Sequence, residues 1–129
     1  MNIRDYSKDD KGFCSKLLKE QGIKEKDFVF EDDLTMVFTQ DNGDIGFFSI
    51  RDTENVWVTH FIIDKKKRGA ELARKSFSLM RELLGSWGIK KVVFSPPADD
   101  ERFNRLIRLY FKVEPYAYGN ESNYYLISL

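Results

Sequence analysis

Residues 56–95 change their hydrophobic pattern twice, and this change restricts the possible folds more than any other feature of the sequence. Apolar residues dominate 56–63, as in a buried strand. From 68 to about 84 they recur at helical spacing, with polar residues on the opposite side. A second apolar run at 91–95 stops at two prolines. A strand, a helix and a strand in this order favour parallel pairing of the two strands, because parallel strands need a long connection.

The N-terminal half predicts a strand, a helix and a hairpin. Residues 2–6 are expected to form a short strand, and Ser7 with Asp10 has the spacing of a capping box that opens a helix to about Gln21. Residues 22–33 lack a clear period and indicate a connecting loop. The β-rich runs 34–39 and 45–51 flank Asn42-Gly43, a strong hairpin signal, and a looser turn at 52–55 leads into 56–63.

The C-terminal half predicts a helix, a strand, a second helix and a last strand. Gly85 and Gly88 are expected to end the first of these helices. Asp99 or Asp100 can cap the second, which carries an apolar stripe over 103–111, and a final strand follows at 124–129. The sequence therefore predicts a single α/β (α+β) domain over 1–129. Its mixed central sheet has about six strands, with three main helices on its two faces.

Charge and composition exclude several classes of protein. Twenty-one basic and 21 acidic residues cancel, so no global field attracts nucleic acid or anionic lipid. The first ten residues are charged throughout, unlike a signal peptide, and no apolar run approaches the roughly 18 residues of a membrane span. Cys14 has no partner for an internal disulfide and is interpreted as a small buried apolar residue. We expect a cytoplasmic protein with no nucleic-acid or membrane partner.

The junction between the strand at 56–63 and the following helix carries four consecutive cations, Lys65 to Arg68. Backbone N–H groups at a helix N-terminus, with positive charge nearby, form an anion site that suits a pyrophosphate. In open α/β sheets, ligands gather at the carboxyl ends of the parallel strands, which here means Ile63 and the segment 64–73. A solvated basic turn is the alternative interpretation.

The element order, the strand VTHFIID running into KKKRGAELA, and the late helix NRLIRLYFKVEPY together resemble the GNAT acetyltransferase superfamily, particularly its short phage-type members. The resemblance covers nearly the whole chain and implies acetyl-CoA as cosubstrate. It implies that the strand residues Phe61, Ile62 and Ile63 contact the coenzyme, with the Ile62-Ile63 backbone aligning pantetheine.

In that family the pyrophosphate lies on backbone amides of a loop patterned Arg/Gln-x-x-Gly-x-Gly/Ala. On this chain the pattern covers Arg68, Gly69, Ala70, Glu71, Leu72 and Ala73. Glu71 stands where the family has glycine. An inward Glu71 would repel phosphates, whereas an outward one would face solvent and complement the helix dipole.

The family's acid is commonly a tyrosine in the pattern Asn-x-x-Ala-x-x-x-Tyr-x-x-x-Gly-Phe. Counted from Asn104, which the resemblance places in the coenzyme site, Phe111 takes the tyrosine place and Pro115 begins the segment that replaces Gly-Phe. Tyr110 is one position early, a rotation of about 100° around the helix. Tyr110 is therefore the candidate acid, with an aromatic at the edge of the core as the alternative.

His60 is the only histidine and lies near the family's usual position for a general base. The alternative is a structural histidine in a strand, and Asp52 and Glu54 are weaker candidates for the base. A single histidine excludes a multi-histidine zinc site, and no Cys/His spacing supports any metal.

Two functions follow from these residues. The first is an acetyl-CoA-dependent N-acetyltransferase that acetylates a primary amine of a small molecule or protein. The second is a phage-encoded GNAT-like scaffold without chemistry, acting as a binding or assembly protein. The basic loop and His60 favour the first, and Glu71, Phe111 and Pro115 favour the second. Joint exposure of the following aromatic residues would indicate a protein-binding patch: Phe28, Phe30, Trp57, Tyr116 and Tyr118. The chain is expected to be a monomer, or a homodimer paired through its final strand.

Overall fold

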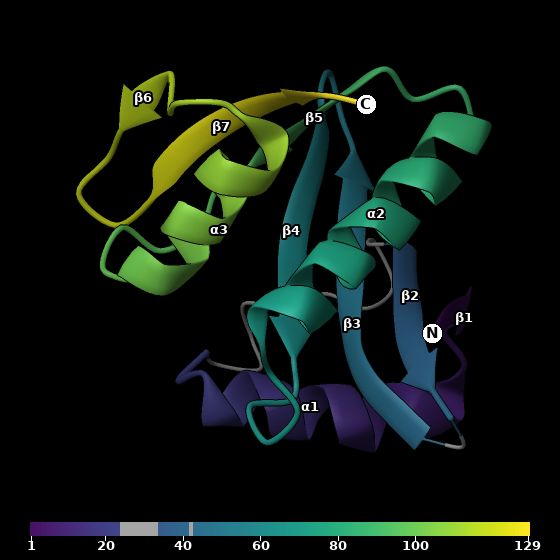
Figure 1. Ribbon diagram of the computed structural model, residues 1–129. Coiled ribbons are helices and arrows are strands. Elements are labelled where there is room, and N and C mark those ends of the chain that lie inside the picture. Colours follow the sequence, from purple (N-terminus) through teal and green to yellow (C-terminus); the bar gives the residue numbers. More distant parts are fainter. Residues whose placement is uncertain (24–33, 42) are drawn as a thin grey trace.

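The computed structural model describes residues 1–23, 34–41 and 43–129 (Figure 1). In chain order its elements are β1 (Asn2–Asp5), the short 3-10 helix η1 (Lys8–Asp10), α1 (Lys11–Glu20), β2 (Leu34–Gln40), β3 (Gly43–Asp52), β4 (Val56–Ile63), α2 (Ala70–Ser86), β5 (Lys91–Phe94), α3 (Glu101–Phe111), β6 (Ala117–Tyr118) and β7 (Asn123–Ser128). The predicted order of strands and helices is confirmed. The expected loop over 22–33 lies mostly outside the described residues, as do Phe28, Phe30 and Asn42.

The strands form one mixed sheet in the order β1-β2-β3-β4-β5-β7-β6. Among the strands of the described residues, only β4 and β5 pair in parallel, through Trp57 with Val93 and Val58 with Phe94. The described residues contain seven strands against the expected six or so, because the two-residue β6 adds one. The parallel pairing inferred from the strand-helix-strand order is confirmed.

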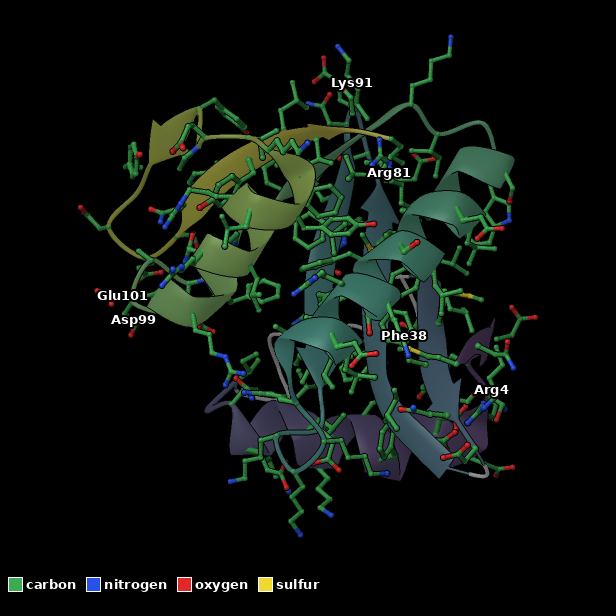
Figure 2. All side chains as sticks on the ribbon, in the orientation of Figure 1. Arg4, Phe38, Arg81, Lys91, Asp99 and Glu101 are labelled. Carbon is green, nitrogen blue, oxygen red and sulfur yellow. The ribbon has the colours of Figure 1, made fainter. Side chains whose placement is uncertain are left out.

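Helices cover both faces of the sheet. Helices α2 and α3 pack on one face over a large apolar core, in which Phe77 and Ile107 are fully buried. Phe38 lies in this interior, whereas Asp99 and Glu101 extend from the start of α3 toward solvent (Figure 2).

On the other face, α1 packs Cys14, Leu17 and Leu18 against Phe47 of β3 and Ile62 of β4. Burial raises the pKa of the Cys14 thiol to about 12, which fits its predicted role as an apolar core residue. No helix among the described residues is long and apolar enough to cross a membrane.

One expectation about the glycines at the end of α2 is wrong. Gly85 lies inside α2, and only Gly88, with φ of +83°, follows the C-cap at Trp87. Gly88 alone has the left-handed backbone that glycine adopts without strain, so the helix continues past the first glycine and ends before the second. Along the outer side of the final strand, β6 pairs with Asn123 and Tyr124, the first two residues of β7. The pairing of this strand with a second copy therefore stays a prediction.

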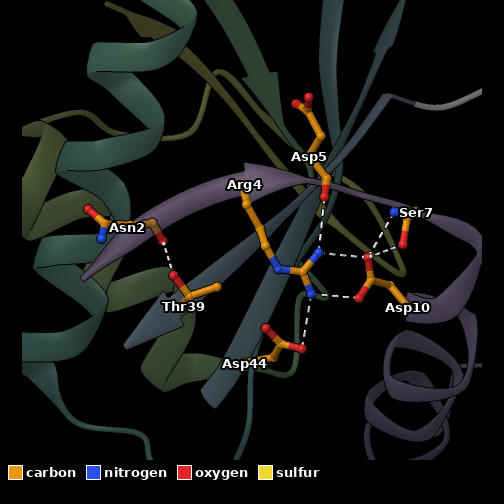
Figure 3. A network of polar contacts seen from close by, with 7 residues as sticks. All are labelled: Asn2, Arg4, Asp5, Ser7, Asp10, Thr39 and Asp44. Atoms are coloured by element: carbon orange, nitrogen blue, oxygen red, sulfur yellow. Dashed lines mark hydrogen bonds and ion pairs between the residues drawn. The ribbon is translucent and has the colours of Figure 1, made fainter. Parts of the chain in front are cut away.

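Arg4 joins three segments at the start of the fold (Figure 3). Its guanidinium donates to both carboxylate oxygens of Asp10, at 2.9 and 2.6 Å, and to Asp44 at the start of β3, at 3.0 Å. The Ser7 N–H donates to the same Asp10 carboxylate at 2.8 Å, which confirms the predicted capping box. Asp10 is buried, and its hydrogen bonds from Arg4 lower the pKa of the carboxyl group. These contacts fix β1 and the start of α1 against β3.

We expect Asp10→Asn to lower the free energy of unfolding at pH 7 by about 1–3 kcal/mol, the usual effect of losing a buried charged hydrogen-bond partner. The folded pKa of Asp10 is lower than the unfolded one, so its stabilisation is complete near neutral pH and lost as pH falls through the folded pKa. Urea unfolding at several pH values should therefore show a shallower acid limb in Asp10→Asn than in wild type. The exposed neighbour substitution Asp9→Asn is the control, and equal pH slopes in the two variants would contradict the assignment.

Gly46 allows β3 to approach β4 closely. A Cβ at this position would overlap the Ile62 carbonyl oxygen and lie 2.8 Å from the Ile63 Cδ1. Gly46 is buried and pairs with Ile63 in the ladder. Any larger residue must therefore displace the strand that carries the predicted site.

Gly46→Ala is expected to destabilise the fold by about 1–3 kcal/mol, the range found for overpacking a core. Gly85→Ala is the matched control, because a Cβ there meets nothing within 4 Å and alanine favours a helix. Thermal unfolding should show a lower Tm for the first variant and an unchanged or higher Tm for the second. Equal shifts would mean that the approach of β3 to β4 does not restrict this position.

Candidate functional site

Strands β4 and β5 separate soon after they meet. They pair through Trp57 and Val58 of β4, but β5 ends at Phe94 while β4 continues to Ile63. Pro96 and Pro97 follow β5, and neither has a backbone N–H. Because successive residues of a strand direct their N–H groups to opposite sides, the two prolines remove one donor toward each neighbouring strand. The sheet therefore opens at the carboxyl ends of its parallel pair.

A cleft of about 180 Å3 occupies this opening. Its walls come from the end of α1, β4, the start of α2, the exit of β5 and the start of α3. The lining residues are Gln21, Ile23, Val58 to Ile63, Arg68, Gly69, Ala73, Phe94 to Pro97, Asp100, Arg102, Phe103 and Leu106. Phe61 and Phe103 belong to the face under α2 and α3, whereas Ile62 belongs to the face under α1. The cleft is therefore bordered by residues from both faces of the sheet.

The open edge of β4 presents backbone groups to the cleft. The Asp64 N–H donates to the Ile45 carbonyl of β3 at 2.7 Å, and Arg68 Nε donates to the Ile63 carbonyl at 2.8 Å. Because N–H and C=O groups alternate between the two sides of a strand, the backbone of Ile63 and Phe61 faces away from β3. The Ile62 carbonyl faces β3 instead, against Gly46.

A β-bulge lies where the strands part. Ser49 pairs with His60 and Ile50 with Val58, which leaves Thr59 as the extra residue of β4. The Thr59 hydroxyl donates to the Ser49 carbonyl at 3.2 Å. A bulge of this kind bends a strand and redirects its backbone groups, and bulges are frequent beside functional sites.

The N-terminus of α2 provides the backbone amides that were predicted for an anion. Gly69 is the N-cap and has no side-chain cap bond, and the first helical bond runs from the Ala73 N–H to the Gly69 carbonyl at 3.0 Å. The N–H groups of Ala70, Glu71 and Leu72 precede that bond and have no partner within the helix. They form a positive helix end beside the cleft.

The charged side chains around this helix end point in different directions. Glu71 is exposed and forms an ion pair with Lys75 one turn later, at 3.4 Å, so its carboxylate is directed to solvent. The Lys67 ammonium lies near Gly43, in the hairpin between β2 and β3. Arg68 lines the cleft, and Gln21 accepts from its guanidinium when the amide takes the orientation that satisfies both groups. Arg68 thus joins the end of α1 to the end of β4.

The structure brings together only part of the predicted site. His60, Phe61, Ile62, Ile63, Arg68, Gly69 and Ala73 line the cleft. Ala70, Glu71 and Leu72 lie next to it in the first turn of α2. Tyr110 packs between Phe77 and Phe111, with ring centroids 5.4 and 4.7 Å away, and no tyrosine is among the described residues that line the cleft. Asn104 is buried beneath the cleft wall and is hydrogen-bonded inside the protein.

Sequence reasoning missed the wall opposite β4. Asp100, Arg102, Phe103 and Leu106 at the start of α3 line the cleft, together with Ser95 and Pro97. The proline pair was a usable signal, because it predicts where β5 must leave the sheet. Gln21 and Ile23 carry no such signal, since only packing brings the end of α1 to β4. No group of three or more potential metal ligands is assembled within the described parts of the chain.

Comparisons with known proteins identify the fold. No family model matches the sequence, and no curated protein does. Solved structures do match: Ard1 from Thermoplasma volcanium has a TM-score of 0.78 at 13% identity, covering 98% of this chain and 97% of that one. An IAA acetyltransferase from Bacillus cereus ATCC 14579 has 0.77 at 16% identity, covering 98% of each chain. The PaiA N-acetyltransferase from Thermoplasma acidophilum, in complex with coenzyme A, has 0.74 at 11% identity, covering 99% and 98%.

These matches extend over nearly the whole of both chains at low sequence identity. Another structure with a TM-score of 0.77 is described as a nucleotide-linked sugar GNAT. The chain has the GNAT fold, in agreement with the family that its sequence resembles.

Proposed function

We propose that this protein is an acetyl-CoA-dependent N-acetyltransferase that transfers an acetyl group to a primary amine. The observation that carries the proposal is the cleft between the separated ends of β4 and β5, with the uncapped N-terminus of α2 at its rim. A GNAT-fold neighbour was solved in complex with coenzyme A, which supports the same ligand class here.

The residues of the cleft fit a long, narrow ligand with a phosphorylated end. The amides of Ala70, Glu71 and Leu72 would hold the pyrophosphate, and Arg68 would add charge beside them. The backbone groups of Phe61 and Ile63 would align the pantetheine amides in the manner of a neighbouring strand. This assignment moves the expected alignment from Ile62-Ile63 to Phe61 and Ile63, because the Ile62 backbone faces β3.

When bound, acetyl-CoA supplies the acetyl group as a reactive thioester. The protein then contributes mainly position, since a correctly oriented amine and thioester need little further help. A strand N–H near the bulge at Thr59 would polarise the carbonyl group. His60 lines the cleft and would take the proton from the ammonium form of the acceptor.

The acceptor is proposed to be a small molecule or a protein. Among the GNAT-fold neighbours are a spermidine N-acetyltransferase and a ribosomal-protein-S18-alanine N-acetyltransferase, which represent these two classes. The acceptor would approach from the face under α1, on which Ile62 lies and where His60 is 6.5 Å from Phe47 between ring centroids. Coenzyme and acceptor would then meet from opposite faces of the sheet.

One observation favours the alternative function, a GNAT-like binding or assembly protein without chemistry. Tyr110 is held in the contact between α2 and α3, so the described cleft has no tyrosine to protonate a leaving thiolate. Tyr116 and Tyr118 are 59% and 74% exposed, and Trp57 contacts Tyr124, which in turn contacts Tyr116. These aromatic residues would offer a protein-binding surface in that case.

Coenzyme A at 100 times its dissociation constant should stabilise the protein by about 2.7 kcal/mol, seen as a raised Tm. Ala73→Leu should reduce or abolish this shift, because Ala73 lines the cleft at the first turn of α2. Ser78→Leu places the same side chain on the exposed face of that helix and should respond like wild type. No shift in the wild-type protein at millimolar coenzyme A would refute the proposed function.

A thiol-release assay with acetyl-CoA and a panel of amines separates the two functions. Thiol release that depends on the added amine supports the enzyme, whereas coenzyme binding without turnover on any acceptor favours the binding protein.

Glu71→Gln is expected to change the affinity for coenzyme A by less than about threefold, because the carboxylate faces solvent and pairs with Lys75. Isothermal titration at low and high salt measures the effect. A tenfold tighter complex in the variant would mean that Glu71 turns toward the phosphates when the coenzyme binds.

A further inference from the structure

Asn104 is buried in the first turns of α3, with 2% of its surface exposed. Its Nδ2 group donates to the Pro97 carbonyl at 2.9 Å and to the Asp100 carbonyl at 2.8 Å. Its Oδ1 accepts from the Tyr125 hydroxyl at 2.8 Å and from Asn123 Nδ2 at 3.0 Å. A carboxamide has two donor hydrogens and two acceptor lone pairs, so these four bonds use its full capacity.

The orientation of this amide is fixed by its partners. A reversed amide would place Oδ1 against the carbonyl oxygens of Pro97 and Asp100, two acceptors, so the reversal is excluded. No hydrogen-bonding group of Asn104 is left for a ligand in the cleft.

The partners of Asn104 belong to the cleft wall. Pro97 and Asp100 line the cleft, at the exit of β5 and at the N-cap of α3. Prolines have no N–H, so this exit can be held mainly through its carbonyl oxygens. The Pro96 carbonyl accepts from the Asn123 N–H at 3.1 Å. The Pro97 carbonyl accepts from Asn104 Nδ2 and also from the Asp100 N–H, the latter at 3.1 Å.

We propose that Asn104 is a positioning residue: it holds the exit of β5 to α3 and β7, and so fixes the wall of the cleft opposite β4 without touching the coenzyme. This inference rests on the proposed function, because the cleft that it shapes is the proposed coenzyme site. It gives Asn104 a different role from the ligand contact that the family resemblance implies.

The test compares substitutions that remove different hydrogen bonds of the same network. Asn104→Asp replaces the amide NH2 group, with its two donor hydrogens, by a carboxylate oxygen that faces the carbonyl oxygens of Pro97 and Asp100. Asn104→Ser is gentler, because a serine hydroxyl can still donate to the carbonyl four residues earlier, at Asp100, but cannot reach Pro97. Tyr125→Phe is the matched control, since it removes a bond to the amide oxygen and leaves the Pro97 and Asp100 bonds intact.

Two measurements are made at a temperature where all variants are folded. Isothermal titration with coenzyme A should give a dissociation constant raised at least tenfold in Asn104→Ser and Asn104→Asp, and less than threefold in Tyr125→Phe. Hydrogen exchange of the ligand-free proteins should be faster at the Ala98 and Asp100 amides in the two Asn104 variants. If Asn104→Asp does not fold, Asn104→Ser alone decides.

Each other result overturns the proposal. Weakened binding with unchanged exchange in the ligand-free protein would mean that Asn104 contacts the coenzyme directly. Faster exchange with unchanged affinity would mean that the wall does not shape the site. If the wild-type protein binds no coenzyme A, the proposed function fails, and the exchange measurement still decides whether Asn104 holds the β5 exit.

Discussion

The separation of β4 from β5 creates the cleft and sets what its walls must satisfy. A strand that has lost its neighbour must satisfy its backbone groups in another way, because unpaired N–H and C=O groups are costly once shielded from water. Here Arg68 takes the Ile63 carbonyl, and the remaining open edge faces a cleft. The same separation places the positive end of α2 beside that edge. The open edge of β4 and the N-terminus of α2 thus share one opening.

Both walls of this opening are held by hydrogen bonds between side chains and backbone groups inside the protein. On the α1 side, Arg68 ties the end of β4 to Gln21. On the α3 side, Asn104 and Asn123 hold the carbonyl oxygens of a proline pair that cannot donate. The aromatic core below is continuous from Phe61 through Phe77 to Tyr110, so the tyrosine predicted for catalysis is part of the packing between α2 and α3. The cleft therefore offers backbone amides, one histidine and a few polar side chains for chemistry.

The accuracy of the sequence predictions follows the range of the forces involved. The helical starts after Ser7 and after the Asp99-Asp100 pair were predicted because caps act within one turn. The structure adds that Ser7 caps the 3-10 helix η1, with α1 following at Lys11, and that Asp100 is the cap of α3. The strand-helix-strand order correctly predicted the parallel pair, because a connection as long as a whole helix favours parallel pairing of the two strands that it joins. Gly85 was misread because a glycine ends a helix only where the backbone turns left-handed, and that angle is not visible in sequence. The two-residue β6 was missed because such a short pairing leaves no periodic signal.

Local sequence was sufficient to predict the order of elements, the helix start that follows 56–63 and the point where β5 must stop. These features depend on local pattern, on proline's missing donor and on glycine or cap chemistry near each position. Packing decided that Glu71 faces solvent, that Tyr110 lies at the edge of the core and that Asn104 is saturated by internal bonds. The reason is geometric: the direction of a side chain depends on helix rotation and on neighbours distant in sequence. A family pattern fixes the position of a residue along the chain and leaves its partners to the packing.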